Sequence, residues 1–168
     1  RRRRTSGRVM KIGLISDTHN QLRPEVFEIF EDVELILHAG DVGAMDIIAE
    51  LETLAPVHAV MGNTDSSALQ SRVRDEIRLE LEGHRVVVVH GHLLGSPNAD
   101  RLHAAYADAD VIVYGHTHRQ RTDLRDGCLI VNPGAAGAAR FDLKPCVAIL
   151  TLEPGRPPHV QHVPIATS

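Results

Sequence analysis

Five short apolar segments of the chain, each the length of a buried strand, run directly into turns rich in aspartate, asparagine and histidine. Helix-like segments at 24–31, 44–54 and 98–107 lie between or after them; in the second, apolar residues recur every three to four positions. Strands that alternate with helices predict βαβ units and a largely parallel central sheet. The five strand-like segments span residues 10–15, 34–38, 57–61, 85–89 and 111–114.

The second half of the chain has a different pattern, in which strands follow one another through turns. One domain with two packed sheets covered by helices accommodates both halves. No repeat or linker divides the sequence, so we predict a single domain over residues 10–168, preceded by a basic extension over residues 1–9. The additional strand-like segments are 75–81, 119–124, 128–131, 146–152 and 159–164.

Composition and charge exclude several classes of protein. No apolar run approaches the roughly 18 residues that a membrane span needs. Residues 1–9 hold five arginines, which leaves 13 basic residues against 22 acidic ones, a balance of −9. This acidic body argues against nucleic acid as a tightly bound partner. The two cysteines, Cys128 and Cys146, are too few for a disulfide framework, so we expect a reduced, cytoplasmic protein.

The polar residues that follow the five strands form a candidate metal site. Ligands of open α/β sheets bind beyond the carboxyl ends of the strands, so strands lying side by side would bring these side chains to one sheet edge. Two carboxylates packed together repel each other unless a cation neutralises them. Nitrogen and oxygen donors without thiolate suit Mn, Fe, Co, Ni or Zn, and seven of them suit two ions that share a carboxylate. The seven candidate ligands are Asp17, His19, Asp41, Asn63, His90, His116 and His118.

The order and spacing of these residues resemble the calcineurin-like metallophosphoesterase superfamily, specifically its small single-domain phosphodiesterase branch. The resemblance covers roughly residues 10–152 and includes Asn132-Pro133-Gly134. It implies an α/β fold, a four-layer αββα sandwich with two mixed β-sheets flanked by helices. It also implies two divalent metal ions per chain, with Mn²⁺ the first choice. By motif, one ion would be held by Asp17, His19, Asp41 and His118, and the other by Asp41, Asn63, His90 and His116.

The resemblance also implies a mechanism, in which a hydroxide between the two ions attacks phosphorus in line. Many relatives carry a histidine after the Gly-Asn pair, where it is thought to protonate the leaving group, but this chain has Thr64. General acid catalysis contributes about 10²–10⁴-fold, and a threonine hydroxyl is too weak an acid to replace imidazolium. We therefore expect a preference for leaving groups that depart without a proton, with His92 and Asp65 as candidate catalytic residues.

These observations predict a metal-dependent phosphodiesterase that acts on a small phosphodiester. Two other classes of protein stay open at this stage. One is a non-catalytic metal-binding protein–protein scaffold related to coat-complex subunits, and the other is a mononuclear iron oxygenase with two histidines and a carboxylate. A homodimer is an option that the sequence does not decide. The histidines outside the strand-end turns, such as His38 and His84, are interpreted as structural or surface residues.

Overall fold

The computed structural model describes residues 8–65, 69, 73–137 and 143–165, and its strands form two five-stranded sheets. The first sheet has the order β10-β9-β1-β2-β3. Its β1, β2 and β3 are parallel, whereas β9 pairs antiparallel with both β1 and β10. The strands are β1 (Met10–Ile15), β2 (Leu35–His38), β3 (Val57–Ala59), β9 (Cys146–Leu152) and β10 (His159–Pro164).

The second sheet has the order β4-β5-β6-β8-β7. Its three central strands are parallel, and the strand at each edge pairs antiparallel with its neighbour. Both sheets are therefore mixed, as the family resemblance implied. The strands are β4 (Glu76–Leu81), β5 (His84–Val89), β6 (Val111–Val113), β7 (Arg121–Arg125) and β8 (Cys128–Asn132).

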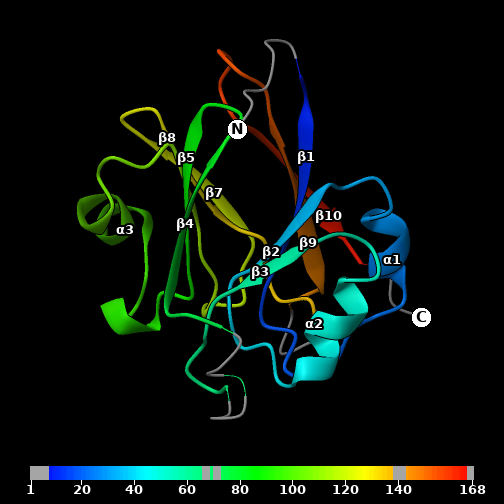
Figure 1. Cartoon of the computed structure of the whole chain (residues 1–168). Coiled ribbons are helices and arrows are strands. Elements are labelled where there is room, and N and C mark those ends of the chain that lie inside the picture. The colour runs from blue at the N-terminus through cyan, green and yellow to red at the C-terminus, as the bar shows by residue number, and fades with distance from the viewer. Residues whose placement is uncertain (1–7, 66–68, 70–72, 138–142, 166–168) are drawn as a thin grey trace.

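Helices cover the outer face of each sheet, as Figure 1 shows. The first sheet packs against α1 (Glu25–Ile29) and α2 (Met45–Leu51), and the second packs against α3 (Ala99–Ala105). A buried apolar core from both sheets, including Leu14, Leu37, Val88 and Val113, fills the space between them. The predicted four-layer αββα sandwich is confirmed.

One expectation about the sheet is wrong: the five strands that end in candidate ligands do not share one sheet. Three of them, β1, β2 and β3, belong to the first sheet, whereas β5 and β6 belong to the second. Apolar periodicity reports which residues are buried, but it does not report which strands pair across long stretches of sequence. The side chains still converge because the carboxyl ends of the parallel strands in both sheets lie at the same end of the sandwich (Figure 1).

The predicted basic extension is only partly visible, since residues 1–7 lie outside the described residues. Arg8 forms ion pairs with Glu34 and with Glu82, which belong to segments next to β2 and between β4 and β5. This arginine therefore links the two sheets at the end of the sandwich opposite the candidate site. None of the helices in the described part of the chain has the length and apolar character that a bilayer crossing needs.

Candidate metal centre

The loops after β1 and β2 run side by side and bring the first candidate ligands together. The Asp17 amide donates to the Gly40 carbonyl and the His19 amide donates to the Asp41 carbonyl, each at 2.9 Å. Asp17, His19 and Asp41 have positive φ angles of 54°, 46° and 54°. His116 and His118, in the loop after β6, have φ angles of 75° and 65°. Such conformations cost non-glycine residues about 1–3 kcal/mol each and cluster at functional sites.

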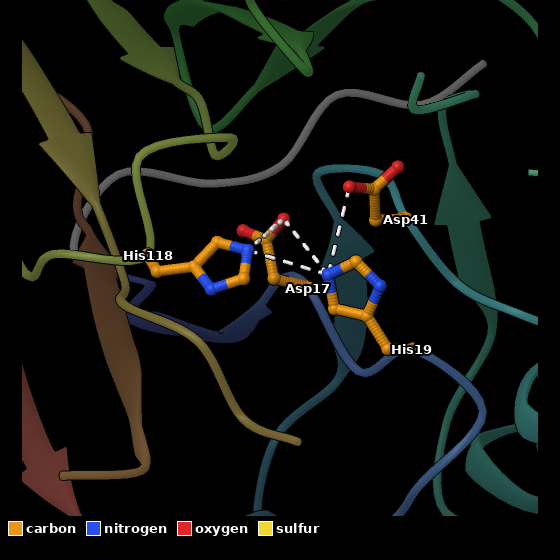
Figure 2. Close-up of side chains that lie close together, drawn as sticks. All are labelled: Asp17, His19, Asp41 and His118. Atoms are coloured by element: carbon orange, nitrogen blue, oxygen red, sulfur yellow. Dashed lines mark hydrogen bonds and ion pairs between the residues drawn. The ribbon is translucent and has the colours of Figure 1, made fainter. Parts of the chain in front are cut away.

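Four of the predicted ligands form a first group, Asp17, His19, Asp41 and His118, whose side chains point toward one another in Figure 2. One ligand atom from each residue lies within 4.8 Å of the others. Nε2 of His118 is 3.5 Å from Oδ1 of Asp17, and Nε2 of His19 is 3.6 Å from Oδ2 of Asp41. These donors, two carboxylates and two imidazoles, suit a divalent transition metal.

The other three predicted ligands form a second group around the side-chain oxygen of Asn63. This Oδ1 atom lies 3.0 Å from Nε2 of His90 and 3.2 Å from Nδ1 of His116. Oδ2 of Asp41 lies 3.3 Å from the same His90 nitrogen. Asp41 therefore contacts both groups through one oxygen, in the position that a shared carboxylate requires. All seven predicted ligands meet in one place.

Asp17 supplies the clearest test of whether the site fits a cation. Its carboxylate is fully buried, and Oδ2 accepts hydrogen bonds from the Ser16 hydroxyl at 2.8 Å and the His116 amide at 3.2 Å. Oδ1 is also buried but has no hydrogen-bond partner in the described structure. A buried carboxylate oxygen without a donor is costly, and a bound cation removes that cost. The first group therefore fits a metal ion.

The hydrogen bonding of His90 fits a metal ligand in the same way. Its Nδ1 atom lies 2.7 Å from the Ala39 carbonyl, which can only accept, so Nδ1 carries a proton. In the neutral ring Nε2 then has a free lone pair, and it faces oxygen atoms of Asn63 and Asp41 that also only accept. Either a proton or a cation must occupy this space. A ligating histidine held by a backbone carbonyl through its other nitrogen is the usual arrangement at metal sites.

The ionisation of the site follows from these contacts. Burial disfavours the charged form of Asp41, but hydrogen bonds from His90 and Thr64 outweigh it and lower the pKa of this carboxyl. Burial also disfavours protonated His90, yet the hydrogen bond with Asp41 and the charges of both aspartates raise its pKa. Burial and the neighbouring His90 lower the pKa of His116. The two aspartates thus favour a positive charge in this space, either a proton on His90 or a cation.

Glycines allow the backbone to approach the ligands closely at two points. A Cβ atom on Gly62 would lie 2.1 Å from Oδ1 of Asp41, and one on Gly115 would lie 2.1 Å from the Ser16 hydroxyl and 2.9 Å from Oδ2 of Asp17. Neither distance leaves room for a side chain. The glycines of the Gly-Asn and Gly-His pairs are therefore required by packing.

The two candidate catalytic residues differ in their surroundings. Ring centroids place His92 5.4 Å from His90 and 6.4 Å from His116, so it lies beside the second group. Asp65 accepts the amides of Gly43 and Gly62, at 2.9 and 2.8 Å, through its two oxygens. These bonds tie together the loops that carry Asp41 and Asn63.

Two residues that hold the candidate ligands in place were not predicted from the sequence. Ser16 donates to Asp17, and the Asn132 amide donates to the Gly115 carbonyl and to the Thr117 hydroxyl, at 3.3 and 3.0 Å. Ser16 directly precedes a ligand, but nothing in its own position distinguishes it from a turn residue. Asn132 belongs to the Asn-Pro-Gly motif, which was the available signal, although its contacts with the ligand loop could not be derived from it.

The sandwich and the cluster define an α/β protein with a candidate cation-binding site of mixed nitrogen and oxygen donors. A calcineurin-like phosphoesterase superfamily domain matches residues 10–155, and the chain belongs to this family. A probable metallophosphoesterase of Methanothermobacter thermautotrophicus is 39% identical over 153 residues, 86% of this chain and 87% of the relative. A phosphodiesterase of Methanocaldococcus jannaschii is 33% identical over 142 residues, 74% of this chain and 83% of the relative.

Solved structures show the same fold. The structure of vacuolar protein sorting 29 from Cryptosporidium parvum aligns with a TM-score of 0.79 and covers 95% of this chain and 99% of its own. Its sequence is 20% identical, so this likeness concerns the fold alone. The family assignment implies divalent metal binding, and the first group of ligands is where the chain offers it.

Proposed function

We propose that this chain is a metal-dependent phosphodiesterase with a dinuclear site. Asp17, His19, Asp41 and His118 would hold one divalent ion, and Asp41, Asn63, His90 and His116 the other, with Mn²⁺ as the first candidate and Fe, Co, Ni or Zn as alternatives. The single observation that carries the proposal is the position of Asp41 Oδ2, within 3.3 Å of His90 and 3.6 Å of His19. When bound, two such ions acidify a water molecule and neutralise charge on the phosphoryl oxygens.

The chain's own residues prepare the site for this reaction. The amide of Thr64 donates to Oδ1 of Asp41 at 2.9 Å, which keeps that carboxylate ionised and its other oxygen directed at both groups. The Ala39 carbonyl keeps the proton of His90 on Nδ1. Hydrolysis forms one bond from a water oxygen to phosphorus and breaks one bond from phosphorus to an ester oxygen, so the products are a phosphomonoester and an alcohol.

The leaving group is the point where this chain differs from many relatives. Thr64 contributes its backbone amide to Asp41, and its hydroxyl cannot act as a general acid at neutral pH. We propose that His92, beside the second group, faces the substrate, and that Asp65 positions the ligand loops through its two backbone contacts. Diesters with acidic alcohols are then the preferred substrates. Rates that do not change with the pKa of the leaving alcohol would remove this part of the proposal.

Hydrolysis of a chromogenic diester tests the proposed function. The chain is stripped with a chelator, Mn²⁺ is returned, and release of nitrophenol from bis(4-nitrophenyl) phosphate and from 4-nitrophenyl phosphate is compared. We expect turnover only with metal and a higher kcat/KM on the diester. Asp41→Asn should lower kcat/KM by at least about a hundredfold. Loss of an outer partner of a metal ligand costs about 10–100-fold, and Asp41 is itself a proposed ligand. Asp46→Asn, exposed in the first turn of α2, is the matched control and should have no effect.

A second candidate function is a protein-binding scaffold that holds metal without turnover. The fold, which this chain shares with a vacuolar protein sorting protein, is compatible with it. The relatives of higher sequence identity, which include the phosphodiesterase of Methanocaldococcus jannaschii, favour the enzyme. A metal-loaded chain that binds two ions but hydrolyses neither ester would support the scaffold and contradict the enzyme.

A further inference from the structure

A cleft with a volume of about 480 Å³ opens next to the candidate metal centre, near the start of α3. Thr117, which lies between the candidate ligands His116 and His118, forms part of its wall. Sites for small molecules have volumes of roughly 300–1,000 Å³. The cleft and the candidate metal centre therefore lie on the same loop, which follows β6.

The charge of the cleft is opposite to that of the chain around it. Among the described residues that line it are Arg119 and Arg121 and no carboxylate, although the chain beyond residue 9 has a balance of −9. The guanidinium of Arg121 donates to the Asp123 carboxylate through Nε at 2.7 Å and through a terminal nitrogen at 3.3 Å. Arg119 is exposed, and no ion pair of its guanidinium is found in the described part of the chain. Arg119 is thus the cation available to a ligand.

Thr117 adds a hydrogen-bond donor to the same lining. Its Oγ1 atom accepts from the Arg119 amide at 3.3 Å and from the Asn132 side-chain amide at 3.0 Å. A hydroxyl oxygen has two lone pairs and one hydrogen. Since both acceptor positions are used, the remaining capacity of this hydroxyl is to donate.

Two side-chain amides in the lining are arranged in the same way. The Gln120 oxygen accepts from the Cys146 thiol at 2.8 Å, and the Asn98 oxygen accepts from the Arg101 amide at 2.9 Å. Each amide therefore has its oxygen engaged and its NH₂ group left to donate. The described polar side chains of the cleft thus offer mainly donors, with Arg119 as the available cation, and they favour a ligand that accepts hydrogen bonds.

We propose that this cleft binds a negatively charged group on one ester arm of the substrate, and that Arg119 determines this specificity. The inference rests on the proposed function, since it places one ester arm of the diester in the cleft while the scissile phosphate lies at the metal centre. Guanidinium and amide donors together recognise planar carboxylate and tetrahedral phosphate groups. The substrate class is therefore a diester that carries a further anionic group, carboxylate or phosphate, near the scissile phosphate.

A matched pair of diesters tests the assignment. 4-Carboxyphenyl 4-nitrophenyl phosphate carries the anion, and the 4-carbamoylphenyl analogue has the same shape without the charge; the released phenols are quantified by chromatography. We expect kcat/KM about tenfold higher for the carboxylate, a magnitude typical of one charge-assisted hydrogen bond. Arg119→Gln should reduce this ratio to near one, and Arg119→Lys should keep part of it. A third diester, with a phosphate group in place of the carboxylate, shows by its kcat/KM which of the two anions the cleft prefers.

Arg125→Gln is the control, because Arg125 lies on β7, pairs with Asp100 of α3 and does not line the cleft. It should leave the ratio unchanged. A wild-type ratio near one, or an equal loss on both substrates in Arg119→Gln, would overturn the assignment. If the metal-loaded chain hydrolyses neither diester, the proposed function fails. Isothermal titration calorimetry with the same two compounds then tests the anion site by itself. Tighter binding of the carboxylate that is lost in Arg119→Gln supports the site, and equal affinities contradict it.

Discussion

Nδ1 of His90 lies 2.7 Å from the carbonyl oxygen of Ala39, the residue that follows β2. His90 itself follows β5, so this hydrogen bond crosses from one sheet to the other. It fixes the proton on Nδ1 and directs the lone pair of Nε2 at Asn63 and Asp41. The packing of the two sheets and the orientation of a candidate metal ligand are thus set by the same contact.

Replacing this ligand tests its role. His90→Gln removes the directed lone pair, and we expect Mn²⁺ to bind at least about tenfold more weakly, since even outer partners of ligands are worth 10–100-fold. His58→Gln, on the exposed face of β3, is the control and should bind like the wild type. Isothermal titration calorimetry on the two variants measures the difference. Equal affinities would mean that His90 is a structural histidine.

Asp17→Asn separates metal binding from folding. Asparagine keeps an oxygen for Ser16 and His116 and places an NH₂ group where the unpartnered Oδ1 lies, within reach of Nε2 of His118. We expect the metal-free variant to be more stable than the wild type by about 1 kcal/mol, because a buried carboxylate oxygen without a hydrogen-bond donor is replaced by an NH₂ group. This corresponds to a Tm increase of roughly 2–4 °C for a chain of this size.

The same variant should lose the stabilisation that Mn²⁺ gives the wild type. Thermal unfolding with a chelator and with excess Mn²⁺ measures both effects. A variant that is less stable without metal, or that still gains stability when metal is added, would show that Asp17 serves the fold and not the ion.

Much of the fold could be predicted because the strands are short and uniformly buried. All four residues of β2 are buried, which gives a clear apolar segment in the sequence. In β4, half-buried and exposed residues alternate over most of the strand, and this strand was also predicted. The helices are shorter than predicted: α1 covers Glu25–Ile29 instead of 24–31. Strand pairing could not be predicted, because β9 pairs with β1 from the far end of the chain and nothing local encodes that choice.

The site was easier to predict than the sheets that build it. All seven candidate ligands come together, because each lies in a loop that follows a strand, and the carboxyl ends of these strands lie at the same end of the sandwich. The cleft beside them was not predicted, since it depends on which atoms of Thr117, Gln120 and Asn98 are already engaged. Such hydrogen bonds join segments that are distant in sequence and leave no pattern in it.

His38 makes stability depend on pH. It is fully buried, with its ring nitrogens near the Thr18 hydroxyl and the Gly40 amide, and burial lowers its pKa from 6.5 to about 4. The folded state therefore resists a proton that the unfolded state accepts. The contribution of His38 to the free energy of unfolding is complete above about pH 6.5 and is lost as the pH falls toward about 4. At about 1.4 kcal/mol per pKa unit, this loss is roughly 3 kcal/mol.

Urea unfolding across this pH range, with a chelator present, measures the loss. His38→Gln removes the titrating group, and we expect its free energy of unfolding to fall less steeply than that of the wild type between about pH 6.5 and pH 4.5. Parallel curves for the two proteins would exclude His38 as the source.

The number of metal ions bound at equilibrium is the most direct test of the proposed dinuclear site. Wild-type chain and Asp41→Asn are dialysed against Mn²⁺, and the bound metal is measured by elemental analysis. We predict two ions per wild-type chain and weaker occupancy of both positions in Asp41→Asn, because one carboxylate oxygen lies within reach of both groups of ligands. A wild-type chain that binds no ion, or an Asp41→Asn chain that binds the same number with the same affinity, would contradict it.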